Sequence, residues 1–211
     1  MKSFSLKKIA LFFFSSIVYL SFALQSPGCG SDSVTTPVIT PPDSNVVVYD
    51  SLGINMSSTN LGINLISGKI TASNDSKKDV LVANSIPGSY FFESGSLAGG
   101  EKTMFNFVDS NYTQAQFDAL SNVSAWGSSG SAIDPALFTQ AGTQTFFLLT
   151  QGMTKTPVFG FYLQGRYDNH ETANRVFGMI RVRSFTGGGL AASVLNISVK
   201  FNKAGLNKFT D

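Results

Sequence analysis

Short apolar runs separated by polar, glycine-containing connections dominate the chain from about residue 80 onward, a pattern typical of β-strands. Several runs are apolar almost without interruption, which predicts strands that are covered on both faces, as in a packed sandwich or a closed barrel. The runs that we predict as strands are Val80–Ala83, Tyr90–Phe92, Met104–Val108, Phe146–Leu149, Val158–Leu163, Phe177–Arg183 and Leu195–Phe201.

The last strand shows the clearest alternation, because its apolar residues are separated by Asn196, Ser198 and Lys200. A period of two is expected of a strand with one buried face. Thr186–Gly189 offers a flexible turn before it, so Phe177–Arg183 and Leu195–Phe201 are predicted to form a C-terminal hairpin.

Glycines interrupt two of the predicted strands, Gly160 in VFGFYL and Gly178 in VFGMIRVRS. A glycine within a strand is typical of a bulge or of a backbone that another group approaches closely. We expect either bulges or aromatic rings packed against the backbone at these two positions.

Two short helices are predicted in the connections between strands. Thr113 and Gln116 have the spacing of a capping box ahead of a helix over Ala115–Leu120. Asp134 is a suitable N-cap for a second helix over Pro135–Ala141, with proline at its first position. The expected fold is therefore all-β, an antiparallel sandwich (or a barrel-like variant) with two short helices in its connecting loops.

The N-terminus has a different pattern, with Lys2, Lys7 and Lys8 ahead of an uncharged apolar run over Ile9–Leu24. This run is shorter than the roughly 20 residues that a bilayer-spanning helix needs, so a secretory signal is the better interpretation. Cys29, the only cysteine, follows shortly after the run. An exported lone thiol has no disulfide partner, whereas lipidation would use it.

These residues resemble the start of a bacterial lipoprotein. In that family the mature protein begins at a cysteine that carries diacylglycerol, usually after a small residue, as Gly28 is here. The resemblance implies a signal peptide over residues 1–28, a lipid on Cys29 and attachment to the outer membrane of the cell envelope. The alternatives are an ordinary signal cleaved, for instance, after Ala23 and, less favoured, a permanent membrane helix.

Residues 29–44 are rich in Ser, Thr and Pro and are expected to form a semi-extended tether. Residues 45–211 are expected to form a single domain, because they are numerous enough for one sizeable core. Asp32-Ser33-Val34 and Asp50-Ser51-Leu52 resemble the short O-glycan acceptor sites of Bacteroidota, which suggests a bacterium of that kind as the source.

Charge argues against nucleic acid as a partner. The chain has 15 basic and 13 acidic side chains, and removal of Lys2, Lys7 and Lys8 with the signal leaves 12 basic ones and a net charge of −1. The basic character of the whole chain therefore belongs to its export signal.

Few residues suggest catalysis or a metal. His170 is the only histidine, and no serine lies in a nucleophile-elbow motif. One cysteine and one histidine cannot supply the four ligands of a structural zinc. The polar cluster Asp168–Glu171 could offer ligands, but a hydrophilic loop between two strands is the favoured interpretation, because such loops require these residue types anyway. The remaining carboxylates show no spacing that pairs them as a glycosidase acid and base.

The candidates for ligand binding are weak and each has a structural alternative. Trp126 lies in a Gly/Ser-rich loop and could stack on a sugar, or it could anchor its loop to the core. Arg181, Arg183 and Lys200 are expected on one face of the C-terminal hairpin. There they could bind an anion, or they could form a solvated outer face that discourages strand pairing with other chains.

The order of elements also resembles the all-β haem-carrier lipoproteins of the HmuY type. The resemblance rests on Ser67–Ile70 with Asp79-Val80, on Phe146–Thr150 and on Val176–Ser184. It implies haem held by side chains such as paired His or Met, with Met153 or Met179 as the partner that His170 would need.

The sequence thus favours a lipid-anchored, non-catalytic binding or structural module at a bacterial cell envelope. It would face the periplasm or the cell surface, bind a glycan or a protein, and need no cofactor. A haem or small-ligand carrier is the first alternative, and a secreted hydrolase that acts on glycans is the second.

Overall fold

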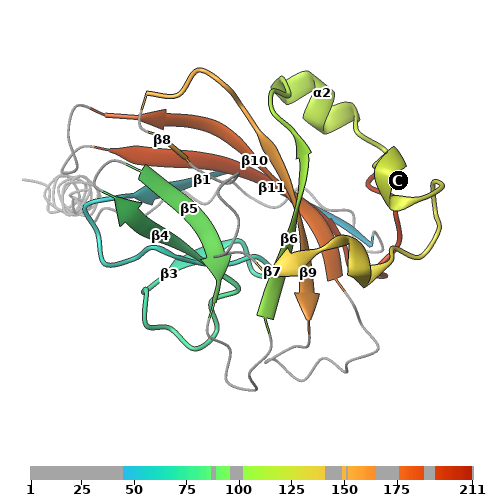
Figure 1. The fold of residues 1–211 in the computed structure, drawn as a ribbon, viewed down its shortest axis with the longest axis horizontal. Coiled ribbons are helices and arrows are strands. Elements are labelled where there is room, and N and C mark those ends of the chain that lie inside the picture. Colours follow the sequence, from blue (N-terminus) through green and yellow to red (C-terminus); the bar gives the residue numbers. More distant parts are fainter. Residues whose placement is uncertain are drawn as a thin grey trace, which may run out of the picture. The chain divides into compact units, whose positions relative to one another are not determined.

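The computed structural model describes residues 45–86, 89–95, 102–140, 149–150, 152–164, 176–187 and 193–210. All of them lie in one compact unit, Ser33–Asp211. The predicted signal, Cys29, the whole tether, the cluster Asp168–Glu171 and the apolar residues 146–148 lie outside the described residues. The described strands form two antiparallel sheets rather than one closed barrel, which confirms the all-β sandwich class (Figure 1).

The larger sheet has six strands in the order β1-β11-β10-β9-β6-β7. The predicted C-terminal hairpin is confirmed, since β10 and β11 are antiparallel neighbours at its centre (Figure 1). The strands are β1 (Val46–Asn55), β6 (Lys102–Asp109), β7 (Thr139–Gln140), β9 (Val158–Gln164), β10 (Val176–Thr186) and β11 (Val194–Asn202).

The smaller sheet has five strands in the order β3-β2-β4-β5-β8. Two of these, β4 and β5, are the predicted runs near residues 80 and 90, and β8 lies at the end of a third. The strands are β2 (Gly62–Asn64), β3 (Lys69–Thr71), β4 (Val80–Ile86), β5 (Ser89–Ser94) and β8 (Leu149–Thr150).

The two sheets enclose the larger of two hydrophobic cores, which we call the inter-sheet core. Aromatic pairs join the sheets across it. The rings of Phe92 and Phe159 lie 5.6 Å apart and those of Tyr90 and Phe185 lie 5.3 Å apart, both nearly edge to face. Edge-to-face contacts of this kind stabilise a core beyond the burial of area alone.

A second core lies on the opposite face of the six-stranded sheet. There Val158, Tyr162, Phe177 and Met179 of β9 and β10 pack against side chains from residues 113–138, which we call the outer layer. Residues 203–210, which we call the C-terminal strap, add Phe209 to this core. Because β9 and β10 have a core on each face, their sequences are apolar almost throughout, as predicted.

The outer layer contains one α-helix and two 3₁₀ turns, α2 (Gln114–Ala119), η1 (Ser124–Trp126) and η2 (Pro135–Leu137). The capping box predicted at Thr113 and Gln116 is present in both directions. The second predicted helix is wrong in type and length. The Asp134 side chain does accept from the N–H of Ala136, but the turn ends at Leu137 and the chain enters β7.

The expectation that aromatic rings approach the strand glycines is confirmed. A Cβ atom on Gly160 would lie 2.2 Å from the ring of Trp126, and one on Gly178 would lie 2.5 Å from the ring of Phe161. Neither gap admits a methyl group, so glycine at both positions is a requirement of packing.

Candidate functional site

The basic residues of the hairpin lie together, as predicted, but two of them, Arg181 and Lys200, are not solvated. Arg181 is opposite Ser198 and Met179 is opposite Lys200 in the β10–β11 register, which places both basic side chains on the face toward the outer layer. Arg181 is 5% exposed and Lys200 is 3% exposed. The interpretation of this face as a solvated surface is therefore wrong, because the outer layer covers it.

Lys200 caps the C-terminal end of helix α2. Its Nζ donates to the carbonyl oxygens of Phe117 at 3.2 Å, Asp118 at 2.8 Å and Leu120 at 3.2 Å. The last carbonyls of a helix have no partners within it and carry partial negative charge, so an ammonium group stabilises them. Burial lowers the pKa of Lys200, and the carboxylate of Asp118 opposes this shift. The alternation in the sequence indicated Lys200 as a candidate, but it did not predict that the end of α2 would be its partner.

Arg181 holds the other end of the same helix. Its Nε donates to the carbonyl of Tyr112 and its Nη1 donates to Oε1 of Gln114, each at 2.8 Å. Burial and the neighbouring charge of Arg183 lower the pKa of Arg181, while Asp118 raises it. The two buried basic residues thus fasten both ends of α2 to the sheet.

Arg183 lies beside this pair and donates a hydrogen bond to the backbone of strand β1. The β1–β11 register shifts between Tyr49 and Leu52, so the carbonyl of Asp50 leaves the regular ladder. Arg183 Nη1 donates to that carbonyl, and so does Oγ of Ser198 at 2.7 Å. These two donors replace the ladder partner that the strand irregularity takes from the Asp50 carbonyl.

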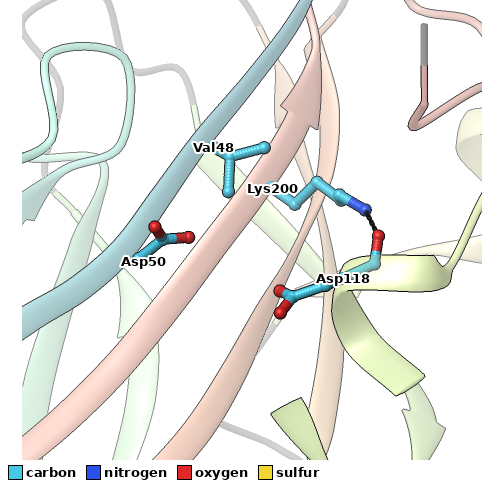
Figure 2. A pocket seen from close by; sticks show the side chains of 4 residues that line it. All are labelled: Val48, Asp50, Asp118 and Lys200. Carbon is cyan, nitrogen blue, oxygen red and sulfur yellow. Dashed lines mark hydrogen bonds between the residues drawn. The ribbon is translucent and has the colours of Figure 1, made fainter. Parts of the chain in front are cut away.

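A small cleft opens between β1 and α2, lined by Val48, Asp50, Asp118 and Lys200. Figure 2 shows the carboxylates of Asp50 and Asp118 on either side of β11, with the Lys200 ammonium turned to the Asp118 carbonyl. The cleft has a volume of about 220 Å³. This lies below the roughly 300–1,000 Å³ of typical ligand pockets. All three N–H groups of Lys200 are directed at carbonyls, so its charge is used within the fold.

Trp126 is an anchor of the outer layer. It is 3% exposed, and its ring centroid lies 5.2 Å from that of Phe138 and 6.0 Å from that of Phe209. With Gly160 beneath it, the ring has no open face for a sugar, which favours the anchor over the stacking interpretation. Among the described residues, nothing accepts a hydrogen bond from its buried Nε1.

The residues tied to the haem-carrier resemblance are not brought together in the part of the chain that the structure describes. His170 lies outside it. Met179 is fully buried in the second core, whereas Met153 packs partly buried against the inter-sheet core. Over the described ranges, no three His, Cys, Asp or Glu side chains are placed to hold a metal ion.

Sequence reasoning missed Asn207, which is fully buried in the C-terminal strap. Its Nδ2 donates to the carbonyls of Val123 at 2.9 Å and Gly127 at 2.8 Å, and its Oδ1 accepts from the Val123 N–H at 2.9 Å. Asparagine is common in exposed turns, so neither the residue type nor the neighbouring sequence predicted these three buried hydrogen bonds.

Comparison with known protein families, with curated proteins and with solved structures finds no match to this chain. Within the described residues, no helix has the length and apolar character needed to cross a membrane.

We predict that Lys200→Met lowers the free energy of unfolding by about 1–3 kcal/mol. Methionine fills a similar volume, but the carbonyls at the end of α2 lose their shared donor, among them the carbonyl of the buried Phe117. Chemical denaturation measures the loss, and Lys203→Met is the matched control because Lys203 is exposed. Equal effects of the two substitutions would contradict the capping role of Lys200.

Proposed function

We propose that the chain is a non-catalytic binding or structural module, held at a bacterial cell envelope by a lipid on Cys29. The sequence supports the anchor. Its only cysteine follows a basic start and an apolar run of signal length, and a Ser/Thr/Pro-rich tether leads from it to the domain. The first strand of the domain begins at Val46, directly after that tether.

One structural observation carries the non-catalytic part of the proposal. The two buried basic residues that could have formed an anion or substrate site, Arg181 and Lys200, direct their N–H groups at the outer layer. Trp126, the candidate for sugar stacking, is packed in the second core. These side chains hold three layers together, which is what a binding or structural framework requires.

Fractionation of cells that express Cys29→Ala tests the proposal. We expect the wild-type chain in the membrane fraction and the variant either soluble or unprocessed, because acyl chains contribute about 0.8 kcal/mol per buried methylene and several chains give stable attachment. Ser31→Ala, two residues away in the tether, is the matched control and should stay membrane-bound. A Cys29→Ala variant that matures normally and stays equally membrane-bound would refute the anchor.

A further inference from the structure

Among the residues that the structure describes, the two cores have no member in common. Along β9 and β10 the side chains alternate, so that Phe161 and Ile180 enter the inter-sheet core while Tyr162 and Met179 enter the second core. Removal of the outer layer from the sheet would therefore leave every contact of the inter-sheet core in place. Local opening of this kind follows the boundaries of such packed units.

The C-terminal strap is joined to the outer layer as one unit. Besides the three side-chain bonds of Asn207, the Asn207 N–H donates to the carbonyl of Ser131 at 2.8 Å, and the Gly130 N–H donates to the carbonyl of Asn207 at 3.0 Å. The Phe209 N–H donates to the carbonyl of Ser121 at 2.8 Å, and the fully buried Phe209 ring contacts Trp126. The strap and the outer layer cannot separate without breaking these bonds. The strap is also bonded to the sheet side, because Nδ2 of Asn202 in β11 donates to the carbonyl of Lys208 at 2.6 Å and the Lys203 N–H donates to the carbonyl of Asn45 at 2.8 Å, and opening must break these two bonds as well.

The closed arrangement also keeps polar groups out of water. The Lys200 ammonium and the Arg181 guanidinium are buried, and within the described residues the Trp126 Nε1 has no acceptor. Opening of the outer layer would return all three groups to solvent, which offsets part of the apolar burial that is lost.

We propose that the outer layer and the C-terminal strap form a lid that opens as one unit from the six-stranded sheet while the sandwich stays folded. The hinges lie at the two ends of the outer layer. Tyr112, just before it, is bonded through its N–H to the carbonyl of Thr156, and Thr139, just after it, pairs with Phe105 in β7. Opening uncovers the strip Val158, Tyr162, Phe177 and Met179 together with Arg181 and Lys200. This device goes beyond the proposed function, which does not need it.

Native-state hydrogen exchange of the full chain, read by mass spectrometry of peptides, tests the lid. We expect amides of residues 113–138 and 203–210 to exchange together and faster than those of β4, β5 and β9. Asn207→Ala removes three buried side-chain hydrogen bonds and should raise both rates by the same factor, roughly 100-fold, with β4 and β5 unchanged.

Two further variants keep the test decisive. Phe209→Leu is milder and should raise the same two sets of rates together if Asn207→Ala fails to fold. Asn64→Ala is the control, because Asn64 bonds to Lys77 and Ser67 at the edge of the five-stranded sheet and should speed exchange only there. A single exchange rate for all strands, or separate responses of strap and outer layer, would overturn the lid.

Discussion

Replacement of Ile197 by aspartate is expected to unfold the protein. Ile197 is fully buried in the inter-sheet core, and in β11 it lies opposite Leu52 on one side and Val182 on the other. A carboxylate there would have neither water nor a partner, and such burial costs several kcal/mol. Typical domains are stable by only about 5–15 kcal/mol, so most of the stability would be lost. Urea denaturation followed by far-UV circular dichroism measures the change.

Asn196→Asp is the matched control, one residue away on the opposite face of the same strand. Asn196 is half-buried, and its Nδ2 donates to Oγ of Ser184 at 3.1 Å. A carboxylate can instead accept from that hydroxyl, so the expected loss is at most about 1 kcal/mol. Equal losses at the two positions would contradict the assignment of the strand faces.

Gly160→Ala is expected to cost about 2–3 kcal/mol, a large effect for one added methyl group. The new Cβ would lie 2.2 Å from the Trp126 ring and 3.2 Å from the Phe138 ring, so the outer layer must shift. Overpacking of this kind typically costs about 1–3 kcal/mol. Trp126 is the only tryptophan, and its fluorescence should move to longer wavelength as water reaches the ring.

Gly53→Ala is the same substitution in another strand of the same sheet. A Cβ on Gly53 would meet its nearest neighbour, Oδ1 of Asn196, at 3.3 Å, which a small side-chain movement relieves. Stability and fluorescence should therefore stay close to those of the wild-type protein. An unshifted spectrum and unchanged stability for Gly160→Ala would show that the outer layer does not pack on Gly160.

The strands that were predicted correctly have uninterrupted or alternating apolar residues, because a core lies on one or both of their faces. The first part of the domain lacked that signal. In β1 the alternation is broken at Asp50 and Ser51, where the register shifts, and β2 and β3 have only three residues each. Such strands are fixed by their neighbours in the sheet, and this information is not local in sequence.

One helix prediction was right and the other wrong, again because local and non-local interactions differ in what the sequence reveals. The capping box of α2 is formed by residues three apart, so the sequence alone specifies where it begins. Asp134 and Pro135 specify a start equally well, but Thr139 and Gln140 pair with Phe105 and Met104 of β6. Strand pairing thus ends the second helix after one 3₁₀ turn. Helix propensity alone could not predict this end, because it depends on a partner strand.

The candidate site could be predicted only in part. Alternation along the hairpin placed Arg181 and Lys200 on one face, but the outer layer that covers these two side chains comes from residues 113–138, far away in sequence. Whether a basic side chain faces water or a helix end depends on that covering. The burial of Trp126 and Asn207 depends on the same long-range packing, so it could not be predicted from the local sequence.

The most direct test of the lipid-anchored module is the mass of the N-terminal peptide of the mature protein, purified from membranes. We expect this peptide to begin at Cys29 and to carry the added mass of diacylglycerol on its sulfur. A mature chain that begins elsewhere, for instance after Ala23, with Cys29 present as an unmodified thiol, would contradict it.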